Sequence, residues 1–281
     1  MLFDAKIDYQ NPDRSFRFAI NRSVGHYNMS RYHLHDHLEL YYLLTGERYY
    51  FIKDRTFLVK KGDLVLIGPR ILHKTMDTGV PDHQRILIYF QEGFTASLSP
   101  DLAVLLNEIF TAQPLLRLSI SGQNHLEYLF QQMCNEVREL HAGTETMLQA
   151  YLLQLLVNAV RFRAQHQTQA FEHPSPMHKK ISEIVQYINE NYAEPLNLTA
   201  VAGRFFISSY HLSRSFKEAT GFTFVEYLNS VRVKEAQRLL RESDFKVIRI
   251  AEQVGFGSIA HFGRVFKTLT GHSPLDYRKL Q

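Results

Sequence analysis

The chain of 281 residues contains a single cysteine, Cys134, so no disulfide can form within it. A lone cysteine is typical of proteins in a reducing compartment, and a cytoplasmic location is therefore expected. The sequence also lacks any run of 18 apolar residues, so we expect no transmembrane helix and no membrane partner. Residues 1–6 have neither the charged start nor the apolar stretch of a secretory signal peptide.

Excess charge is small and unevenly distributed. Residues 178–281 carry 15 Lys and Arg against 10 Asp and Glu, a net charge of +5. Residues 1–177 carry 17 against 18, a net charge of −1, and the two parts add up to the +4 of the whole chain. The positive excess thus lies in the C-terminal part, where it suits a partner made of phosphates.

One segment of the C-terminal part occurs twice at a spacing of 50 residues. Residues 214–221 read RSFKEATG and residues 264–271 read RVFKTLTG, with five identical positions. Tyr227 and Tyr277 keep the same spacing. Two copies of such a unit favour a pair of similar helical modules over a solenoid, which needs three or more.

Each copy has the pattern of a helix, a tight turn and a second helix. In the first copy apolar residues recur at helical spacing over residues 198–205, and Ser208 is a suitable N-cap for a helix over residues 209–220. The outward face of that helix holds Tyr210, Ser213, Arg214 and Lys217. Arg binds guanine edges and Lys binds phosphates, so this face is typical of a DNA recognition helix. A plain solvated face is the alternative, which the repetition disfavours.

The second copy predicts a helix from residue 259 to about residue 269, with Ser258 as its N-cap. Its outward face has fewer base-reading groups, so we expect phosphate anchoring, one Arg contact, and a thymine methyl against Ile259 or Ala260. The predicted DNA-binding residues are Ser209, Tyr210, Ser213, Arg214, Lys217, Ser258, Ile259, Ala260, Arg264 and Lys267.

A helix predicted over residues 225–240 joins the two copies. Its length is about 24 Å at 1.5 Å per residue. With its flanking turns this approaches the roughly 34 Å between successive major grooves on one face of DNA. The two recognition helices are therefore expected to enter neighbouring grooves.

These patterns resemble the signature of the AraC/XylS family of bacterial transcription regulators. In the first half the matching residues are Ala202, Ser208, residues 210–214, Phe216, Lys217, Thr220, Gly221, Tyr227, Leu228, Arg232, Ala236, Leu239 and Leu240. In the second half they are Ile250, Ala251, Gly255, Phe256, Phe262, Arg264, Phe266, Lys267, Gly271, Ser273, Pro274, Tyr277 and Arg278. The resemblance implies a seven-helix domain, with helix-turn-helix motifs at residues 197–220 and 247–270, that binds promoter DNA and acts on RNA polymerase.

The N-terminal part, residues 1–95, contains short apolar runs broken by Gly, Pro and charged turns. This pattern of short apolar runs and turns predicts a compact all-β barrel or jelly roll. The expected strands cover residues 16–20, 32–35, 39–44, 49–52, 56–59, 63–67, 73–75 and 85–90.

His33, His35, Glu39 and His73 resemble the two sequence motifs of the cupin fold, in which such side chains converge inside a small barrel. Three interpretations are open: a divalent metal site, a polar pocket for an effector, and a structural hydrogen-bonded network. The favoured one is an effector pocket without metal, because barrels of this kind in the resembling family often lack metal. Its wall is expected to include Arg31, Tyr41, Tyr49, Phe51 and Arg70, which suit a sugar or a small carboxylate.

Residues 96–165 are expected to be a helical region, with helices over residues 102–110, 125–140 and 146–162. Residues 92–100 are expected to form a loop, and residues 166–177 a polar, proline-marked linker. The apolar faces of the helices pack on the barrel or on a second subunit. Because such helices often form the dimer interface in the resembling family, a homodimer is the hypothesis.

The sequence thus predicts a multi-domain α+β protein, with a cupin-like barrel followed by a DNA-binding domain over residues 178–281. The predicted function is effector-controlled transcription regulation, as an activator in the bacterial cytoplasm, without enzymatic activity and without a cofactor. Two alternatives are a metal-dependent cupin enzyme fused to a DNA-binding domain and a regulator that responds to no ligand.

Overall fold

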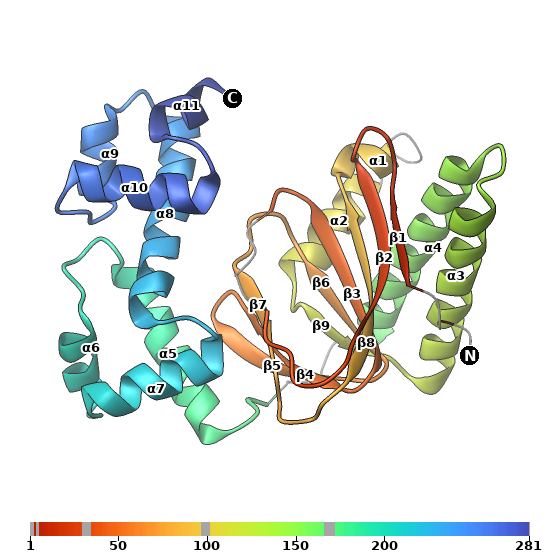
Figure 1. Ribbon diagram of the computed structural model, residues 1–281, viewed down its shortest axis with the longest axis horizontal. Coiled ribbons are helices and arrows are strands. Elements are labelled where there is room, and N and C mark those ends of the chain that lie inside the picture. The colour runs from red at the N-terminus through yellow and green to blue at the C-terminus, as the bar shows by residue number, and fades with distance from the viewer. Residues whose placement is uncertain (1–2, 4–5, 30–34, 97–101, 166–171, 281) are drawn as a thin grey trace. The chain divides into compact units, whose positions relative to one another are not determined.

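The computed structural model describes residues 3, 6–29, 35–96, 102–165 and 172–280. Contacts divide the chain into two compact units, formed by Met1–Lys53 with Phe57–Glu172 and by Asp54–Thr56 with His173–Gln281 (Figure 1). Two β-sheets and helices α1–α4 form the body of the first unit, and helices α5–α11 form the second. The fold is therefore α+β, as the sequence predicts. Among the described helices, none is long and apolar enough to cross a membrane.

The strands of the first unit form two antiparallel sheets. They are β1 Ile7–Gln10, β2 Phe16–Ser23, β3 Leu38–Thr45, β4 Glu47–Ile52, β5 Arg55–Lys60, β6 Asp63–Ile67, β7 His73–Met76, β8 His83–Phe90 and β9 Leu115–Arg117. One sheet has the order β1-β2-β8-β3-β6-β9 and the other the order β5-β4-β7. Seven predicted strands are confirmed, whereas residues 32–34 of the eighth lie outside the described residues. The sequence did not predict β1 and β9.

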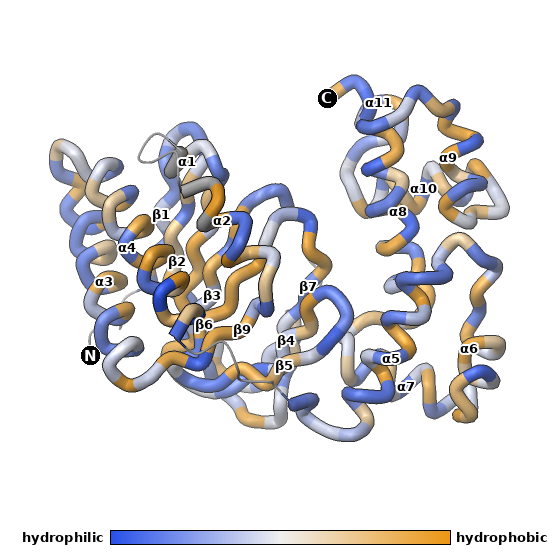
Figure 2. Tube along the Cα trace, turned by 180° about the vertical axis from the view of Figure 1, so that it is seen from behind, coloured by the Kyte–Doolittle hydropathy of each residue, from blue (hydrophilic) through white to orange (hydrophobic). Residues whose placement is uncertain are grey.

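The two sheets face each other and are together called the barrel below. Side chains alternate between the faces of a strand, so Tyr41 of β3 and Leu87 of β8 point to the same side. There they pack in one buried cluster with Tyr50 and Ile52 of β4. Figure 2 shows hydrophobic residues along the central strands of the larger sheet. The polar groups of the candidate ligand site lie on these inward faces.

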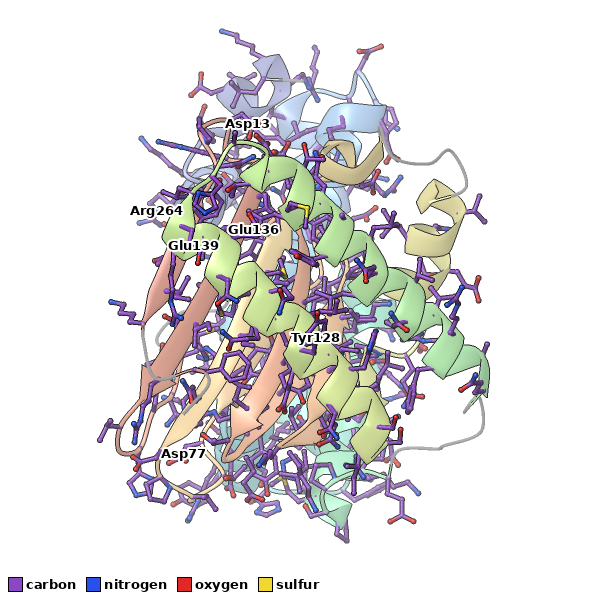
Figure 3. The ribbon with its side chains drawn as sticks, turned by 90° about the vertical axis from the view of Figure 1, so that its right-hand side faces the viewer. Asp13, Asp77, Tyr128, Glu136, Glu139 and Arg264 are labelled. Carbon is purple, nitrogen blue, oxygen red and sulfur yellow. The ribbon has the colours of Figure 1, made fainter. Side chains whose placement is uncertain are left out.

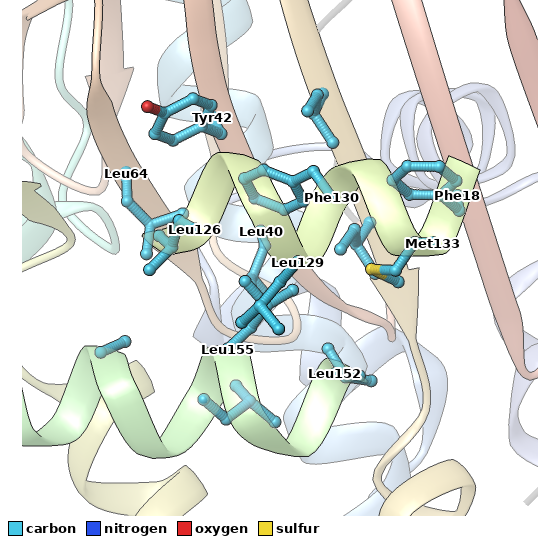
Figure 4. Packing of buried hydrophobic residues seen from close by; sticks show 14 of the residues in the cluster. Phe18, Leu40, Tyr42, Leu64, Leu126, Leu129, Phe130, Met133, Leu152 and Leu155 are labelled. Carbon is cyan, nitrogen blue, oxygen red and sulfur yellow. The ribbon is translucent and has the colours of Figure 1, made fainter. Parts of the chain in front are cut away.

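Helices cover the other face of the larger sheet. They are α1 Glu92–Ala96, α2 Leu102–Thr111, α3 Ile120–Glu139 and α4 Thr144–Gln165. Phe18 and Leu40 of the sheet pack there against Phe130 and Met133 of α3, with Leu155 of α4 in the same cluster (Figure 4). The burial of this face accounts for the apolar helix stripes that the sequence shows.

The loop predicted over residues 92–100 is wrong for Glu92–Ala96, which form α1. Phe94 is buried, and its ring stacks on that of Phe16 with the centroids 4.6 Å apart. This contact fixes a helical turn that has too few residues to show a period in the sequence. Residues 97–100 of the predicted loop lie outside the described residues.

The second unit contains seven described helices, the number that the family resemblance implies. They are α5 Pro176–Asn191, α6 Leu198–Arg204, α7 Ser209–Thr220, α8 Phe224–Glu242, α9 Val247–Gln253, α10 Ile259–Thr270 and α11 Pro274–Lys279. Helix α8 joins an α6–α7 pair to an α9–α10 pair (Figure 1). Of the predicted linker over residues 166–177, residues 166–171 lie outside the described residues, and α5 begins at Pro176 with Ser175 as its N-cap.

Candidate nucleic-acid interface and ligand site

The two recognition helices begin and end in the same way. The Ser208 side chain accepts a hydrogen bond from the His211 amide over 3.2 Å, and Ser258 does the same for His261 over 3.4 Å. Gly221 and Gly271 close α7 and α10 in the left-handed conformation, at φ 76° and 79°. Capping thus fixes both ends of each helix through local sequence, and the predicted N-caps Ser208 and Ser258 are confirmed.

The turns that precede the recognition helices differ by one residue. In each turn an amide donates back to the first helix, Ile207 to Ala202 over 3.1 Å and Phe256 to Ala251 over 2.9 Å. The residue before that amide has a positive φ in both turns, 56° for Phe206 and 89° for Gly255. A Cβ at Gly255 would lie 2.7 Å from the Ala193 carbonyl oxygen, so glycine is required there. The second turn has the additional residue Gly257.

Helix α7 presents one polar face to solvent. Tyr210, Ser213, Arg214 and Lys217 are exposed, and Tyr210 is 78% exposed. Leu212, Phe216 and Ala219 of the opposite face are buried. Ser209, predicted with the exposed set, is partly buried in the first helical turn. The structure therefore brings four of the five predicted α7 residues onto one accessible stripe.

Helix α10 presents a second exposed face. Ile259 is 46% exposed, and Ala260, Arg264 and Lys267 are exposed as well, while Phe262 and Phe266 are buried in the core shared with α8 and α9. Ser258 precedes the helix, and its side-chain oxygen already serves as the cap acceptor. Its hydroxyl proton is the group that remains for a phosphate.

The cationic side chains on these two exposed faces differ from the other arginines of the unit in having no partner for their charge among the described residues. Arg214, Lys217, Arg264 and Lys267 have no ion-pair partner in the part of the chain that the structure describes. Arg232, by contrast, is buried and donates to the carbonyls of Tyr192 and Glu194, each over 2.8 Å. Arg238 of α8 is exposed but paired with Glu242 over 2.6 Å. Unpaired cations on two recognition helices suit phosphate oxygens.

Helix α8 sets the spacing of the two pairs. Its 19 residues span about 28 Å at 1.5 Å per residue, somewhat more than predicted. A capping box starts it, because Thr223 accepts from the Glu226 amide and Glu226 accepts from the Thr223 amide. No proline or glycine interrupts it. The helix is therefore a rigid spacer between the α6–α7 and α9–α10 pairs.

Inside the barrel, His35, Glu39 and His73 come together. Nε2 of His35 lies 2.9 Å from Oε2 of Glu39, and Nε2 of His73 lies 3.4 Å from the same oxygen. Glu39 and His73 are each 1% exposed. The other oxygen of Glu39 accepts a hydrogen bond from the Tyr50 hydroxyl over 2.9 Å. His33, the fourth predicted member, lies outside the described residues.

Backbone carbonyls orient both imidazoles. Nδ1 of His35 donates to the His37 carbonyl over 3.0 Å, and Nδ1 of His73 donates to the Ile71 carbonyl over 2.7 Å. Each Nε2 is thereby directed at Glu39. Burial by itself raises the pKa of Glu39, but His73 and His35 outweigh it and hold that pKa well below its usual range. Burial lowers the pKa of His35, but the hydrogen bond and the charge of Glu39 raise it by more. The pKa of His35 therefore lies above its ordinary value.

The cluster fits a metal ion only in part. The ligand atoms of His35, Glu39 and His73 all lie within 4.8 Å of one another. Two ligands of one zinc ion in tetrahedral geometry lie about 3.3 Å apart, given metal–ligand distances of about 2.0–2.1 Å. The 2.9 Å between His35 and Glu39 is instead a direct hydrogen-bonded ion pair. In this arrangement the three side chains form a hydrogen-bonded network with Tyr50.

Of the residues predicted for the pocket wall, Tyr41 lies on the inward face of the barrel and three others do not. On β4 the inward face carries Tyr50 and Ile52, so Tyr49 and Phe51 lie on the other face. Arg70 is outside the barrel core, where its Nε pairs with Asp36 over 2.5 Å. Arg31, the remaining predicted residue, lies outside the described residues.

Sequence reasoning also missed two buried arginines. Arg48 is 1% exposed, and Arg85 has Nε and Nη1 shielded from solvent. The signal was present in strand alternation: Arg48 lies two residues before Tyr50, and Arg85 two residues before Leu87.

Two family models match separate parts of the chain. Residues 18–156 match the model of the AraC-like ligand binding domain, and residues 201–280 match the model of a helix-turn-helix domain. The chain belongs to the AraC family of transcription regulators. It is a DNA-binding regulator with an N-terminal ligand-binding domain.

Known relatives match either most of the chain or about a third of it. The HTH-type transcriptional regulator YfiF of Bacillus subtilis is 26% identical over 261 residues, which cover 92% of this chain and 81% of the relative. The HTH-type transcriptional activator RhaS of Salmonella schwarzengrund is 38% identical over 100 residues, 36% of each chain. Among solved structures, ToxT of Vibrio cholerae is 16% identical, with a TM-score of 0.40 and coverage of 95% and 98%.

Proposed function

We propose that the chain recognises promoter DNA with α7 and α10 and that a small molecule in the barrel controls this binding. Arg214 reads bases together with Tyr210 and Ser213, and Lys217 and Lys267 bind phosphates. Arg264 is the base-contacting residue of α10. The observation that carries the proposal is the pair of exposed helix faces whose four cations have no ion-pair partner among the described residues.

Salt dependence of DNA binding tests this part. Fluorescence anisotropy with a labelled promoter duplex should show log K falling linearly with log salt concentration, by about 0.9 for each phosphate contacted. Lys217→Ala and Lys267→Ala should each reduce that slope, because these two residues bind phosphates in the proposal. A salt-independent affinity would rule out the proposed interface.

In the barrel, His35, Glu39 and His73 act as hydrogen-bonding partners for the effector, without a metal and without catalysis. Direct contact between His35 and Glu39 supports this, because a metal ion would need to separate them. Effector binding shifts the populations of domain or dimer arrangements by no more than its differential affinity for them. Metal analysis of the purified chain should find less than one equivalent. Stoichiometric zinc that Glu39→Gln or His73→Ala releases would favour a metal-dependent cupin enzyme instead.

A regulator that responds to no ligand is the remaining alternative. Thermal-shift measurements with sugars, amino acids and organic acids separate it from the proposed function, because a ligand of the native state raises the melting temperature. No shift from any compound, together with normal DNA binding, would favour the alternative.

The chain acts as a homodimer that activates transcription through RNA polymerase in the bacterial cytoplasm. The proposed dimer surface is the outer face of α3, where Figure 3 labels Tyr128, Glu136 and Glu139 and where Tyr128 is 60% exposed. The RhaS relative, named a transcriptional activator, supports the direction of regulation. The buried free thiol of Cys134 suits a reducing compartment. Light scattering after size-exclusion chromatography should give the mass of a dimer.

A further inference from the structure

We infer that the barrel ligand is an anion, whose carboxylate or phosphate group binds between Arg48 and Arg85. The inference rests on the proposal that a small molecule binds in the barrel, and it names the chemical class of that molecule. The residues concerned form the arginine cluster, which comprises Tyr41, Arg48, Thr75, His83 and Arg85.

Each member of the arginine cluster has a buried polar atom with no hydrogen-bond partner among the described residues. These atoms are the Tyr41 hydroxyl, Nε of Arg48, the Thr75 hydroxyl, Nε2 of His83, and Nε and Nη1 of Arg85. Tyr41, Arg48, Thr75 and His83 are at most 2% exposed. Buried polar groups are almost always paired in proteins, so a group of such atoms in one place indicates a missing partner.

The members lie on the inward faces of four strands. Thr75 of β7 is the register partner of Tyr50, which packs in the inter-sheet core and follows Arg48 on the same face of β4. The guanidinium carbon of Arg85 lies 5.9 Å from the centre of the Tyr41 ring. The guanidinium carbons of Arg48 and Arg85 each lie 5.8 Å from the ring centre of Tyr27. The two cations thus share one neighbourhood.

Carboxylates of the described residues leave this charge largely unbalanced. Asp77 approaches Nη1 of Arg48 only to 3.7 Å and already pairs with His26 over 2.6 Å. Glu39 is engaged by His35, His73 and Tyr50. Arg85 has no ion pair within the described part of the chain. Guanidinium keeps its charge at any physiological pH, so two such groups together favour an anionic guest.

The unpaired atoms select the same kind of ligand. The guanidinium N–H groups are donors only, and the Tyr41 and Thr75 hydroxyls are able to donate. Burial and the nearby Arg48 and Arg85 lower the pKa of His83 to about 4, so its ring is neutral and adds no further positive charge. A cation finds no compensating charge here. A carboxylate or phosphate supplies several acceptors and neutralises the arginines in bidentate fashion.

Tyr27 lies between the cluster and solvent. Tyr27 is 36% exposed and lies over both arginines, and its ring centroid is 5.9 Å from that of His83. Asp77 lies next to Arg48, on the connection that follows β7 (Figure 3). A guest therefore reaches the cluster from solvent past Tyr27, while its remainder extends toward Tyr50 and Glu39.

The experiment compares matched acids and neutral analogues on the full chain by thermal shift and calorimetry at constant ionic strength. The pairs are galacturonate and galactose, hexanoate and hexanamide, benzoate and benzamide, and glucose 6-phosphate and glucose. At least one acid should raise the melting temperature by several degrees where its neutral analogue does not. The carboxylate and phosphate arms then distinguish the two anion types. Equal shifts within every pair, or no shift with any acid, overturn the inference.

Arg85→Met should abolish the shift, and Arg22→Met is the matched control, because Arg22 is exposed and lies on the face of β2 opposite to Ala19, which packs in the inter-sheet core. Without ligand, Arg85→Met should melt no lower than the wild type, since it removes a buried charge that has no partner. A large loss of stability in ligand-free Arg85→Met would instead assign Arg85 a structural role and overturn the inference. Arg85→Lys should retain a reduced shift.

These outcomes are distinct from those of the proposed function. A neutral sugar that stabilises the chain, with an effect removed by Glu39→Gln, would leave the barrel a ligand domain and would refute only the anionic class. Loss of all ligand binding would leave the DNA interface on α7 and α10 untouched, because salt-dependent binding of the promoter duplex is measured separately.

Discussion

At the scale of single residues, Phe206 carries a local backbone cost that its counterpart Gly255 avoids. It holds φ at 56° with a side chain that is 95% exposed, so burial does not offset the left-handed conformation. Phe206→Gly should therefore raise the free energy of unfolding by about 0.5–1 kcal/mol, after the greater flexibility of glycine in the unfolded chain is included. Urea denaturation of the full chain measures this change.

Ile207→Gly is the control within the same turn. Ile207 is not among the described residues with a positive φ, so glycine there adds flexibility without relieving strain and should lower stability. If Phe206→Gly also lowers stability, the exposed ring makes a contribution that its conformation does not reveal.

Glu39 makes the stability of the barrel depend on pH. Its pKa lies below the ordinary 4.5 in the folded state, because His73 and His35 outweigh the effect of burial. Such a carboxyl contributes stability that is complete above the unfolded pKa and is lost as the pH falls through the folded value. His35 has a raised pKa, so its contribution is complete below 6.5 and is lost as the pH rises.

The lowered pKa of Glu39 and the raised pKa of His35 together define a pH window in which their pairing stabilises the fold. The difference in unfolding free energy between the wild type and Glu39→Gln should be greatest between about pH 4.5 and about pH 6.5, and smaller on either side. Denaturation across this pH range measures it, with Glu252→Gln, an exposed carboxylate on α9, as the control. A difference that stays constant with pH would mean that the imidazoles do not pair with Glu39.

At the scale of elements, the proposed function assigns most of the sequence specificity to α7. Arg214→Ala should weaken binding to the preferred site by roughly 1–3 kcal/mol and relax base preference, whereas Lys217→Ala should weaken all sequences alike. Gel-shift titration against the preferred site and a scrambled duplex measures both. Arg238→Ala on α8 is a suitable control, because Arg238 is exposed but paired with Glu235 and Glu242. Unchanged affinity in Arg214→Ala would refute the assignment.

Sequence predicted the elements best where local chemistry defines them. The N-caps Ser208 and Ser258, together with helical periodicity, gave the recognition helices almost to the residue, because those signals act over a few positions. Helix α1 was missed because a buried contact of Phe94, distant in sequence from Phe16, determines it. The exposed faces of α7 and α10 followed from helical periodicity alone.

The ligand site was predicted only in part. Motif spacing identified His35, Glu39 and His73, because the cupin-like pattern lies in the sequence itself. Strand alternation indicates that Arg48 and Arg85 point inward, but their convergence depends on pairing between separate strands, which one sequence does not reveal. Tyr49 and Phe51 were predicted to line the pocket but lie on the other face of β4. Side chains alternate along a strand, so an error of one residue in the assumed alternation moves every side chain to the other face.

At the scale of the whole molecule, the account depends on two recognition helices held apart by α8. A spacer of about 28 Å between them suits two contact sites roughly one helical turn of DNA apart. Selection of fragments from a random DNA pool by the full chain, followed by sequencing, measures this arrangement directly. We predict two short conserved blocks with centres about 10 base pairs apart, the stronger block being lost in Arg214→Ala. Enrichment of a single block, or of no sequence at all, would contradict the account.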